Sequence, residues 1–227
     1  RGKIPIEHPE YDILSTGFHF DAIKFAEWLR DNYAKPRGVK HKIRTLKRKP
    51  KADLVFDCTG FASLFNKSEW IDYSDYLPNN SAIVTRVHYT DKSTQMKAVT
   101  DCTALSSGWV WNVPTYTRIG TGYNYCDKYI SDEEALNEFR TYLAENVEDD
   151  VHCYSDAMFR KIRYRTGRKK EIWKDNVVSI GLSAGFIEPL ESNGLLSVHE
   201  FLLNFCRVMD NRTNVTQFMR DTFNNHC

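Results

Sequence analysis

Two segments of the sequence run from a short apolar stretch directly into a glycine. They are "ADLVFDCTG", which ends at Gly60, and "NVVSIG", which ends at Gly181. A buried strand that ends in a glycine turn is typical of α/β proteins, and open α/β sheets bind ligands at the carboxyl ends of their strands. We therefore expect Gly60 and Gly181 to lie at one ligand-binding edge.

Three segments have the sequence pattern of helices. Apolar residues recur at helical spacing over 19–34, "HFDAIKFAEWLRDNYA", and over 195–210, "LLSVHEFLLNFCRVMD". We expect the first helix to pack on a sheet and the second to begin within or just after "ESNG". A third helix is predicted from Ser131, because Glu134 follows it at capping-box spacing. The short stretch 41–46, "HKIRTL", predicts a strand.

The middle of the chain is rich in β-type segments that carry aromatic residues. The stretches "SAIVTRVHYT", "SSGWVWNVPT" and "TRIGTGYNYC" lie between 81 and 126 and predict an antiparallel sheet inserted between α/β parts. In "GWVWNVP" the alternation of strand side chains places Trp109 and Trp111 on one face. Two indoles on one face can enclose a flavin or an aromatic substrate, and packing within a core is the alternative.

The charge balance excludes a strong field over the whole molecule. The 227 residues contain 31 Lys and Arg against 30 Asp and Glu, for a net charge of +1. We therefore expect a small neutral or amphoteric substrate and no nucleic-acid or membrane partner. The basic run Lys40–Lys51 lacks the interleaved aromatic residues of a stacking platform, and we interpret it as a solvated connection.

Cysteine spacing and hydropathy bear on where the protein is located in the cell. The six cysteines show no Cys-x-x-Cys or other metal-type spacing, so free thiols and no metal site are expected. No apolar run approaches the roughly 20 residues that cross a bilayer, and the first ten residues lack a signal-peptide core. We expect a cytoplasmic protein. The chain begins without Met and ends soon after a helix, which suggests a fold incomplete at both ends.

The stretch "GLSAGFIEPLESNG", from Gly181 to Gly194, places polar groups where a sheet gives way to a helix. A helix N-terminus favours an anion, and the amides of Asn193 and Gly194 lie there. Glu191 can cap the helix, act as a base or hold a substrate N–H, whereas Glu188 is expected to face solvent or to form a hydrogen bond. His19 has no partner motif and is interpreted as structural.

Several of these stretches together carry a family resemblance. "GWVWNVP" resembles the Gly-Trp-x-Trp-x-Ile-Pro signature of flavin-dependent halogenases, the tryptophan halogenase family, with Val113 in place of isoleucine. "GLSAGFIEPLESNG" resembles the family segment that passes the flavin and ends in Glu-Ser-Thr-Gly. The blocks "FHFDAIKFAEWL", "ADLVFDCTGFASL", "SDYL" and "TGRKKEIWKDNVVSIGLSAG" resemble family blocks in the same order. The resemblance covers nearly the whole chain.

The resemblance implies an α/β, FAD-dependent monooxygenase-like fold with an inserted antiparallel β-sheet. Residues 1–65 and 171–227 would form the flavin-binding parts, and 66–170 most of the inserted substrate-side part. In the family, reduced FAD from a separate flavin reductase reacts with O2 to give a flavin hydroperoxide, which oxidises a halide ion to hypohalous acid. The oxidant then halogenates a small electron-rich aromatic substrate, such as tryptophan or another indole.

By residue match, the resemblance also implies roles for particular positions. Glu191 would assist the substitution on the substrate, and the amides of Asn193 and Gly194 would hold the halide. The positions next to the flavin would be Gly60, Gly181, Leu182 and Leu195. The wall between flavin and substrate tunnel would be formed by Trp109, Trp111 and Pro114.

The chain also departs from the family pattern. It contains no Gly-x-Gly-x-x-Gly fingerprint and lacks the family's essential lysine, expected upstream of "FHFDAIKF"; Asn193 stands where threonine is usual. We therefore expect this chain alone to be inactive. Two other interpretations stay open, a flavin-dependent hydroxylating monooxygenase and a catalytically incomplete, non-enzymatic fragment of a halogenase.

Overall fold

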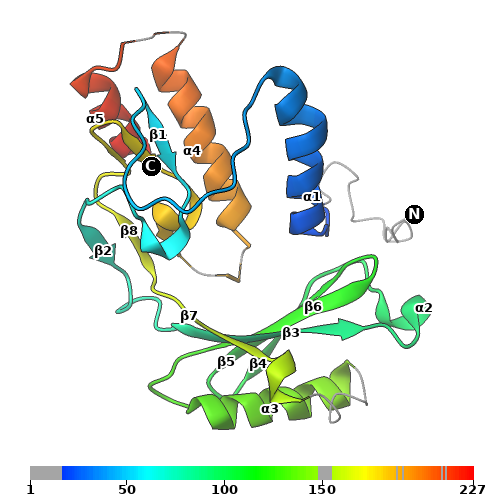
Figure 1. Ribbon diagram of the computed structural model, residues 1–227. Helices are drawn as coiled ribbons and strands as arrows, with labels where there is room; N and C mark the ends of the chain where they lie inside the picture. The colour runs from blue at the N-terminus through cyan, green and yellow to red at the C-terminus, as the bar shows by residue number, and fades with distance from the viewer. Residues whose placement is uncertain (1–16, 148–154, 188, 191, 211, 213) are drawn as a thin grey trace, which may run out of the picture. The chain divides into compact units, whose positions relative to one another are not determined.

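The computed structural model describes residues 17–147, 155–187, 189–190, 192–210, 212 and 214–227 (Figure 1). The chain divides into two compact units that it enters in alternation. Unit 1 is built from the segment up to Ile43 and from Ser81 to Arg163, and unit 2 from Arg44 to Asn80 and from Tyr164 to Cys227. Each unit has its own hydrophobic core.

Unit 1 contains a five-stranded antiparallel sheet with the strand order β4-β5-β6-β3-β7. Its strands are β3 (Ser81–His88), β4 (Asp101–Leu105), β5 (Gly108–Pro114), β6 (Arg118–Tyr125) and β7 (Arg160–Arg163). Its helical segments are α1 (Ala22–Trp28), η2 (Leu29–Ala34), η3 (Lys35–Arg37), α2 (Lys92–Gln95), α3 (Asp132–Asn146) and η6 (Asp156–Met158). The predicted antiparallel sheet is confirmed.

Helix α3 covers one face of this sheet (Figure 1). Ser131 accepts a hydrogen bond from the Glu134 amide, and the Glu134 side chain accepts one from the Ser131 amide, so the predicted capping box is confirmed. Phe139 and Leu143 of α3 are fully buried in one cluster with Val110 of β5. Apolar burial between helix and sheet thus forms the core of unit 1.

The first helix differs from the expectation. Its sequence is helical from Ala22, but after Trp28 it continues as a π-helix, Leu29–Ala34. None of its residues is buried, and Trp28 is 55% exposed, so the expected packing on a sheet is absent from the described part of the chain. The strand predicted over 41–46 is also wrong, because these residues form no ladder and five of the six are exposed.

Unit 2 contains two three-stranded sheets, with the strand orders β1-β10-β9 and β11-β8-β2. Their strands are β1 (Val55–Asp57), β2 (Trp70–Asp72), β8 (Gly167–Lys169), β9 (Trp173–Lys174), β10 (Val177–Ser179) and β11 (Gly185–Phe186). The helical segments are η4 (Gly60–Ala62), η7 (Gly181–Ser183), α4 (Gly194–Met209) and α5 (Gln217–His226). The helix predicted to begin within or just after "ESNG" is confirmed as α4, which begins at Gly194.

The core of unit 2 joins its β1-β10-β9 sheet to α4 and α5. Trp173 packs its ring 5.1 Å from that of Phe205 and 5.6 Å from that of Phe223, centroid to centroid. Phe223 also belongs to the buried cluster of this unit.

The chain passes from one compact unit to the other after Ile43, Asn80 and Arg163. The functional division into 1–65, 66–170 and 171–227 stays a prediction.

Candidate functional site

The two glycine turns of unit 2 lie side by side. Strand β1 pairs with β10 in parallel, with Val55 opposite Val177 and Asp57 opposite Ser179, so both strands end at the same edge. A single helical turn follows each strand, η4 from Gly60 and η7 from Gly181. The Ser183 hydroxyl donates a hydrogen bond of 3.1 Å to the Gly60 carbonyl oxygen. The prediction that Gly60 and Gly181 lie at one edge is confirmed, and the binding of a ligand there stays a prediction.

Both turns need glycine, and the turn at Gly60 is open. Gly60 has φ +68° and Gly181 φ +63°, in the left-handed region that other residues rarely adopt. A Cβ built on Gly60 meets no atom within 4 Å. Leu182 follows Gly181 with 40% of its surface exposed, and Leu64 is 44% exposed. The edge therefore offers bare backbone next to accessible aliphatic side chains.

A buried carboxylate lies beneath this edge. Asp57, the last residue of β1, is fully buried. Its Oδ1 accepts hydrogen bonds from the Thr59 amide at 3.0 Å and from the Thr59 hydroxyl at 2.6 Å. Its Oδ2 accepts from the amides of Phe65 at 2.9 Å and Asn66 at 3.3 Å. Burial by itself raises the pKa of Asp57, but these hydrogen bonds outweigh it and hold the pKa below its usual range.

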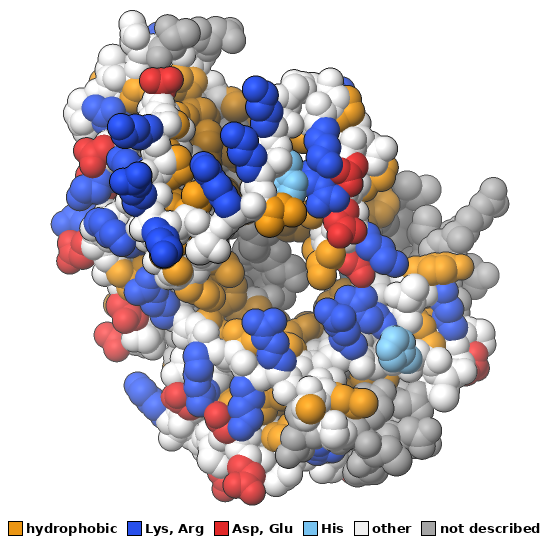
Figure 2. Space-filling model, in the orientation of Figure 1, with side chains coloured by type: hydrophobic (Ala, Val, Ile, Leu, Met, Phe, Trp, Pro, Cys, Tyr) orange, Lys and Arg blue, Asp and Glu red, His pale blue; other side chains and the backbone are white. Residues whose placement is uncertain are grey.

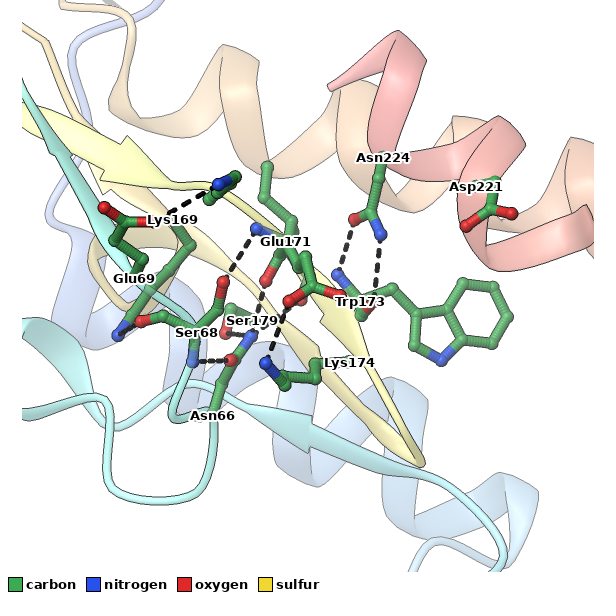
Figure 3. Close-up of polar contacts among 12 residues, drawn as sticks. Asn66, Ser68, Glu69, Lys169, Glu171, Trp173, Lys174, Ser179, Asp221 and Asn224 are labelled. Atoms are coloured by element: carbon green, nitrogen blue, oxygen red, sulfur yellow. Dashed lines mark hydrogen bonds and ion pairs between the residues drawn. The ribbon is translucent and has the colours of Figure 1, made fainter. Parts of the chain in front are cut away.

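Asn66 extends the same network into both sheets of unit 2 (Figure 3). Its Nδ2 donates to the Ser179 hydroxyl of β10 at 2.9 Å and to the Ile172 carbonyl oxygen at 3.1 Å. Its Oδ1 accepts from the Ser68 amide at 2.8 Å, and the carbonyl oxygen of Ser68 accepts from Lys169 Nζ at 3.0 Å. Burial lowers the pKa of Lys169. The sequence prediction missed both Asp57 and Asn66, although an acidic residue inside the apolar stretch "LVFDC" was an available signal.

The start of α4 carries the predicted halide residues. Asn193 is the N-cap, and its side chain makes no capping hydrogen bond to the helix. Its carbonyl oxygen accepts the first helical bond, from the Ser197 amide at 2.9 Å. Nothing lies within 4 Å of a Cβ built on Gly194, and Leu195 is 55% exposed. Glu188 and Glu191 lie outside the described residues.

The two tryptophans lie together on β5 in unit 1. Trp109 and Trp111 share a face of the strand, with ring centroids 5.7 Å apart and ring planes inclined by 57°. The predicted common face is confirmed, and neither ring is fully buried. The third residue predicted for the wall, Pro114, is buried at the end of the strand. Its carbonyl oxygen lies 2.8 Å from His19 Nδ1, and His19 Nε2 lies 2.9 Å from the Thr100 hydroxyl, so His19 has structural contacts.

The remaining polar and charged features are consistent with a mixed surface. On the face drawn in Figure 2, Lys and Arg side chains lie among Asp and Glu side chains. The basic residues of the run Lys40–Lys51 are exposed, and Lys49 Nζ donates to Asn176 Oδ1 at 2.7 Å. Among the described cysteines, Cys58, Cys126, Cys206 and Cys227 are free thiols. Within the described ranges no group of three or more His, Cys, Asp or Glu residues could hold a metal, and no helix is long and apolar enough to cross a membrane.

A family model described as Tryptophan halogenase matches residues 4–227, and the chain therefore belongs to the tryptophan halogenase family. It is 35% identical over 215 residues to Tryptophan 6-halogenase SttH from Streptomyces toxytricini, a match that covers 85% of this chain and 40% of SttH. The chain thus spans less than half the length of this curated relative.

Solved structures agree with this assignment. The VirX1 apo structure aligns with a TM-score of 0.81 at 38% identity over 92% of this chain and 43% of that one. A crystal structure of SttH aligns with a TM-score of 0.80 at 33% identity, over 91% of this chain and 43% of that one. BrvH, a flavin-dependent halogenase from Brevundimonas sp. BAL3, aligns with a TM-score of 0.76 at 29% identity, over 91% and 44%. The predicted fold class is confirmed: mixed α/β with antiparallel sheets, like flavin-dependent halogenase structures.

Proposed function

We propose that the protein to which this chain belongs is a halogenase that uses reduced FAD, O2 and a halide ion to halogenate an electron-rich aromatic ring, such as that of tryptophan or another indole. The observation that carries the proposal is the pair of glycine turns at the neighbouring ends of β1 and β10. They occur in a chain of the tryptophan halogenase family, and a ligand at this edge is what an α/β sheet predicts.

The residues at this edge fit a flavin. An isoalloxazine is flat and largely apolar, with polar atoms along its rim. The open backbone at Gly60 leaves room for close approach, and Leu182 presents apolar surface. We assign Gly60, Gly181, Leu182 and Leu195 to flavin contact. Bound reduced FAD would supply two of the four electrons that reduce O2, and the halide ion would supply the other two, so that with one proton the products are oxidised FAD, hypohalous acid and water.

The other residues would handle the halide and the substrate. The N-terminus of α4, where the Asn193 side chain makes no capping hydrogen bond, favours an anion, and we assign the backbone amides of Asn193 and Gly194 to the halide. Trp109, Trp111 and Pro114 would form the wall along which the oxidant reaches the ring. Glu191 would stabilise the developing positive charge on the ring or accept the proton that the halogen replaces.

Product analysis tests the reaction. The full-length protein, supplied with a separate flavin reductase, FAD and halide, is expected to give halogenated products from a panel of indoles and phenols, measured by mass spectrometry. Glu191→Gln should lower turnover by roughly 100-fold or more, as for a positioned acid or base, whereas Glu188→Gln serves as the matched control. Oxygenated products without halogenated ones would assign a hydroxylating monooxygenase instead.

We further propose that the 227-residue chain alone is inactive and binds FAD weakly. It contains no Gly-x-Gly-x-x-Gly turn, and such a turn supplies much of the anchoring of the FAD phosphates. Titration followed by flavin fluorescence measures the affinity. Submicromolar binding by this chain would contradict the proposal and show that the two strand ends suffice.

A further inference from the structure

Three residues with left-handed backbone cluster around the edge of unit 2. Two are the turn glycines, and the third is Ser63, which has φ +39° and is 4% exposed. A non-glycine residue in this conformation carries a backbone cost, so neighbouring groups must hold it in place. Such strained positions concentrate at sites that must be shaped before a ligand arrives. The question is therefore which group holds these turns.

The carboxylate of Asp57 holds groups from both turns. On the β1 side, its oxygens accept from Thr59 before the η4 turn and from Phe65 and Asn66 after it. Leu64 is drawn in as well, because its amide donates to the Thr59 hydroxyl oxygen at 2.9 Å. These contacts close the segment 59–66 into one loop around a single side chain.

The β10 side reaches the same carboxylate through Ser183. The Ser183 hydroxyl is fully buried and lies 3.4 Å from Asp57 Oδ1, in addition to its 3.1 Å contact with the Gly60 carbonyl oxygen. A backbone bond of 3.0 Å from the Ile180 amide to the Asp57 carbonyl oxygen lies just before Gly181. Asp57 is thus the residue at which the two turns meet.

An ionised carboxylate is suited to this position because it only accepts hydrogen bonds. Each Asp57 oxygen faces N–H or O–H donors, and a carboxamide at the same place would turn its own N–H2 group towards donors. The buried charge has a full set of partners, which is the condition under which such a charge persists in a protein interior.

We propose that Asp57 is a positioning residue that couples the two glycine turns into one preformed cofactor-binding edge. This inference rests on the proposed function, in which the two turns are assigned to flavin contact. Asp57 acts through the backbone of the turns and not by touching the cofactor. A change that loosens the loop 59–66 is therefore expected to loosen η7 as well, and the reverse.

Hydrogen exchange measures this link without any flavin. In Asp57→Asn, one carboxylate oxygen becomes a donor that faces the amides of Phe65 and Asn66. Exchange is expected to become about tenfold faster or more in peptides covering 59–66 and also in those covering 181–184, since charge-assisted bonds are lost. Asp72→Asn is the matched control, because the exposed Asp72 caps a turn of the same unit through Ser74. Peptides of α5, which contributes Phe223 to the core of the same unit, report global unfolding and should change in neither variant.

Ser183→Ala separates coupling from general stability. This small change removes the Ser183 hydroxyl that bridges the turns, and it is expected to speed exchange in both 59–66 and 181–184 while α5 stays protected. It also keeps the proposal testable if Asp57→Asn does not fold. Faster exchange in only one turn, or unchanged protection in both, would overturn the coupling.

A flavin titration of the full-length protein then connects the coupling to the cofactor. Ser183→Ala and Asp57→Asn are expected to weaken FAD binding about tenfold, and Asp72→Asn to leave it unchanged. Equal FAD affinity in all variants would overturn the positioning role. If the wild-type protein itself does not bind FAD, the proposed function fails, whereas the exchange data still decide whether Asp57 couples the turns.

Discussion

At the scale of single residues, Gly122 of β6 determines where the ring of Trp111 can lie. Gly122 is directly opposite Trp111 in the ladder, and a Cβ built on it would lie 2.3 Å from the Trp111 ring. The missing side chain thus gives the indole its position next to Trp109. The tunnel wall that we propose depends on a residue that carries no functional group.

Gly122→Ala is accordingly expected to displace Trp111 and to destabilise the protein by about 1–3 kcal/mol, the usual cost of overpacking. Denaturant unfolding and tryptophan fluorescence measure the two effects. Gly120→Ala on the same strand is the control, since its Cβ would meet only the Val113 carbonyl oxygen at an ordinary 3.8 Å. Equal behaviour of the two variants would contradict the close contact.

Tyr123, also on β6, is expected to lower the free energy of unfolding at alkaline pH. Burial, with the hydrogen bond from its hydroxyl to Glu138 at 2.8 Å, raises the pKa of Tyr123 to about 12. A pKa raised in the folded state stabilises below the unfolded value of about 10, and this contribution is lost as the pH rises through about 12. The stability advantage of wild type over Tyr123→Phe should therefore shrink between these pH values, as measured by urea unfolding.

The matched control for this titration is Tyr129→Phe, because Tyr129 is 74% exposed. A stability difference between wild type and Tyr123→Phe that does not change with pH would show that the buried hydroxyl is not the source of the alkaline loss of stability.

At the scale of elements, the capping box fixes where α3 begins. Ser131→Ala removes the oxygen that accepts from the Glu134 amide and is expected to cost about 1 kcal/mol. The loss should appear as a lower denaturation midpoint with an unchanged slope. Glu133→Gln, in the same first turn but outside the box, should cost less. If both variants lose the same stability, charge near the helix start matters more than the box.

At the scale of the whole molecule, each compact unit has a separate core. Phe139 lies in the core of unit 1 and Phe223 in that of unit 2, and both are fully buried. Replacing either by alanine is expected to cost about 3–5 kcal/mol within its own unit. Hydrogen exchange should then increase in β6 for Phe139→Ala and in β10 for Phe223→Ala.

The exposed Phe218 of α5 is the control for these two variants. Phe218→Ala should change exchange in neither unit. If Phe139→Ala and Phe223→Ala each loosened β6 and β10 to the same extent, the chain would unfold as one cooperative body and the division into two cores would have no energetic meaning.

Features that depend only on neighbours along the chain can be predicted from the amino-acid sequence. A capping box needs only Ser131 and Glu134, a common face needs only the alternation of Trp109 and Trp111, and a strand that ends at a glycine turn is a local pattern. These signals hold because each requires only a few bonds within one segment. The family, too, follows from the sequence, through the two stretches "GWVWNVP" and "GLSAGFIEPLESNG".

The polar residues that shape the edge, in contrast, can be identified only in the folded chain. Asn66 donates to the carbonyl oxygen of Glu171, which lies 105 positions away in the sequence. The side chain of Asp57 is linked to the second glycine turn through its contact with Ser183. The short strands of unit 2, two to three residues each, are too brief to show a period. A buried polar group stabilises only when its partners surround it, and those partners come from segments that folding, not sequence proximity, brings together.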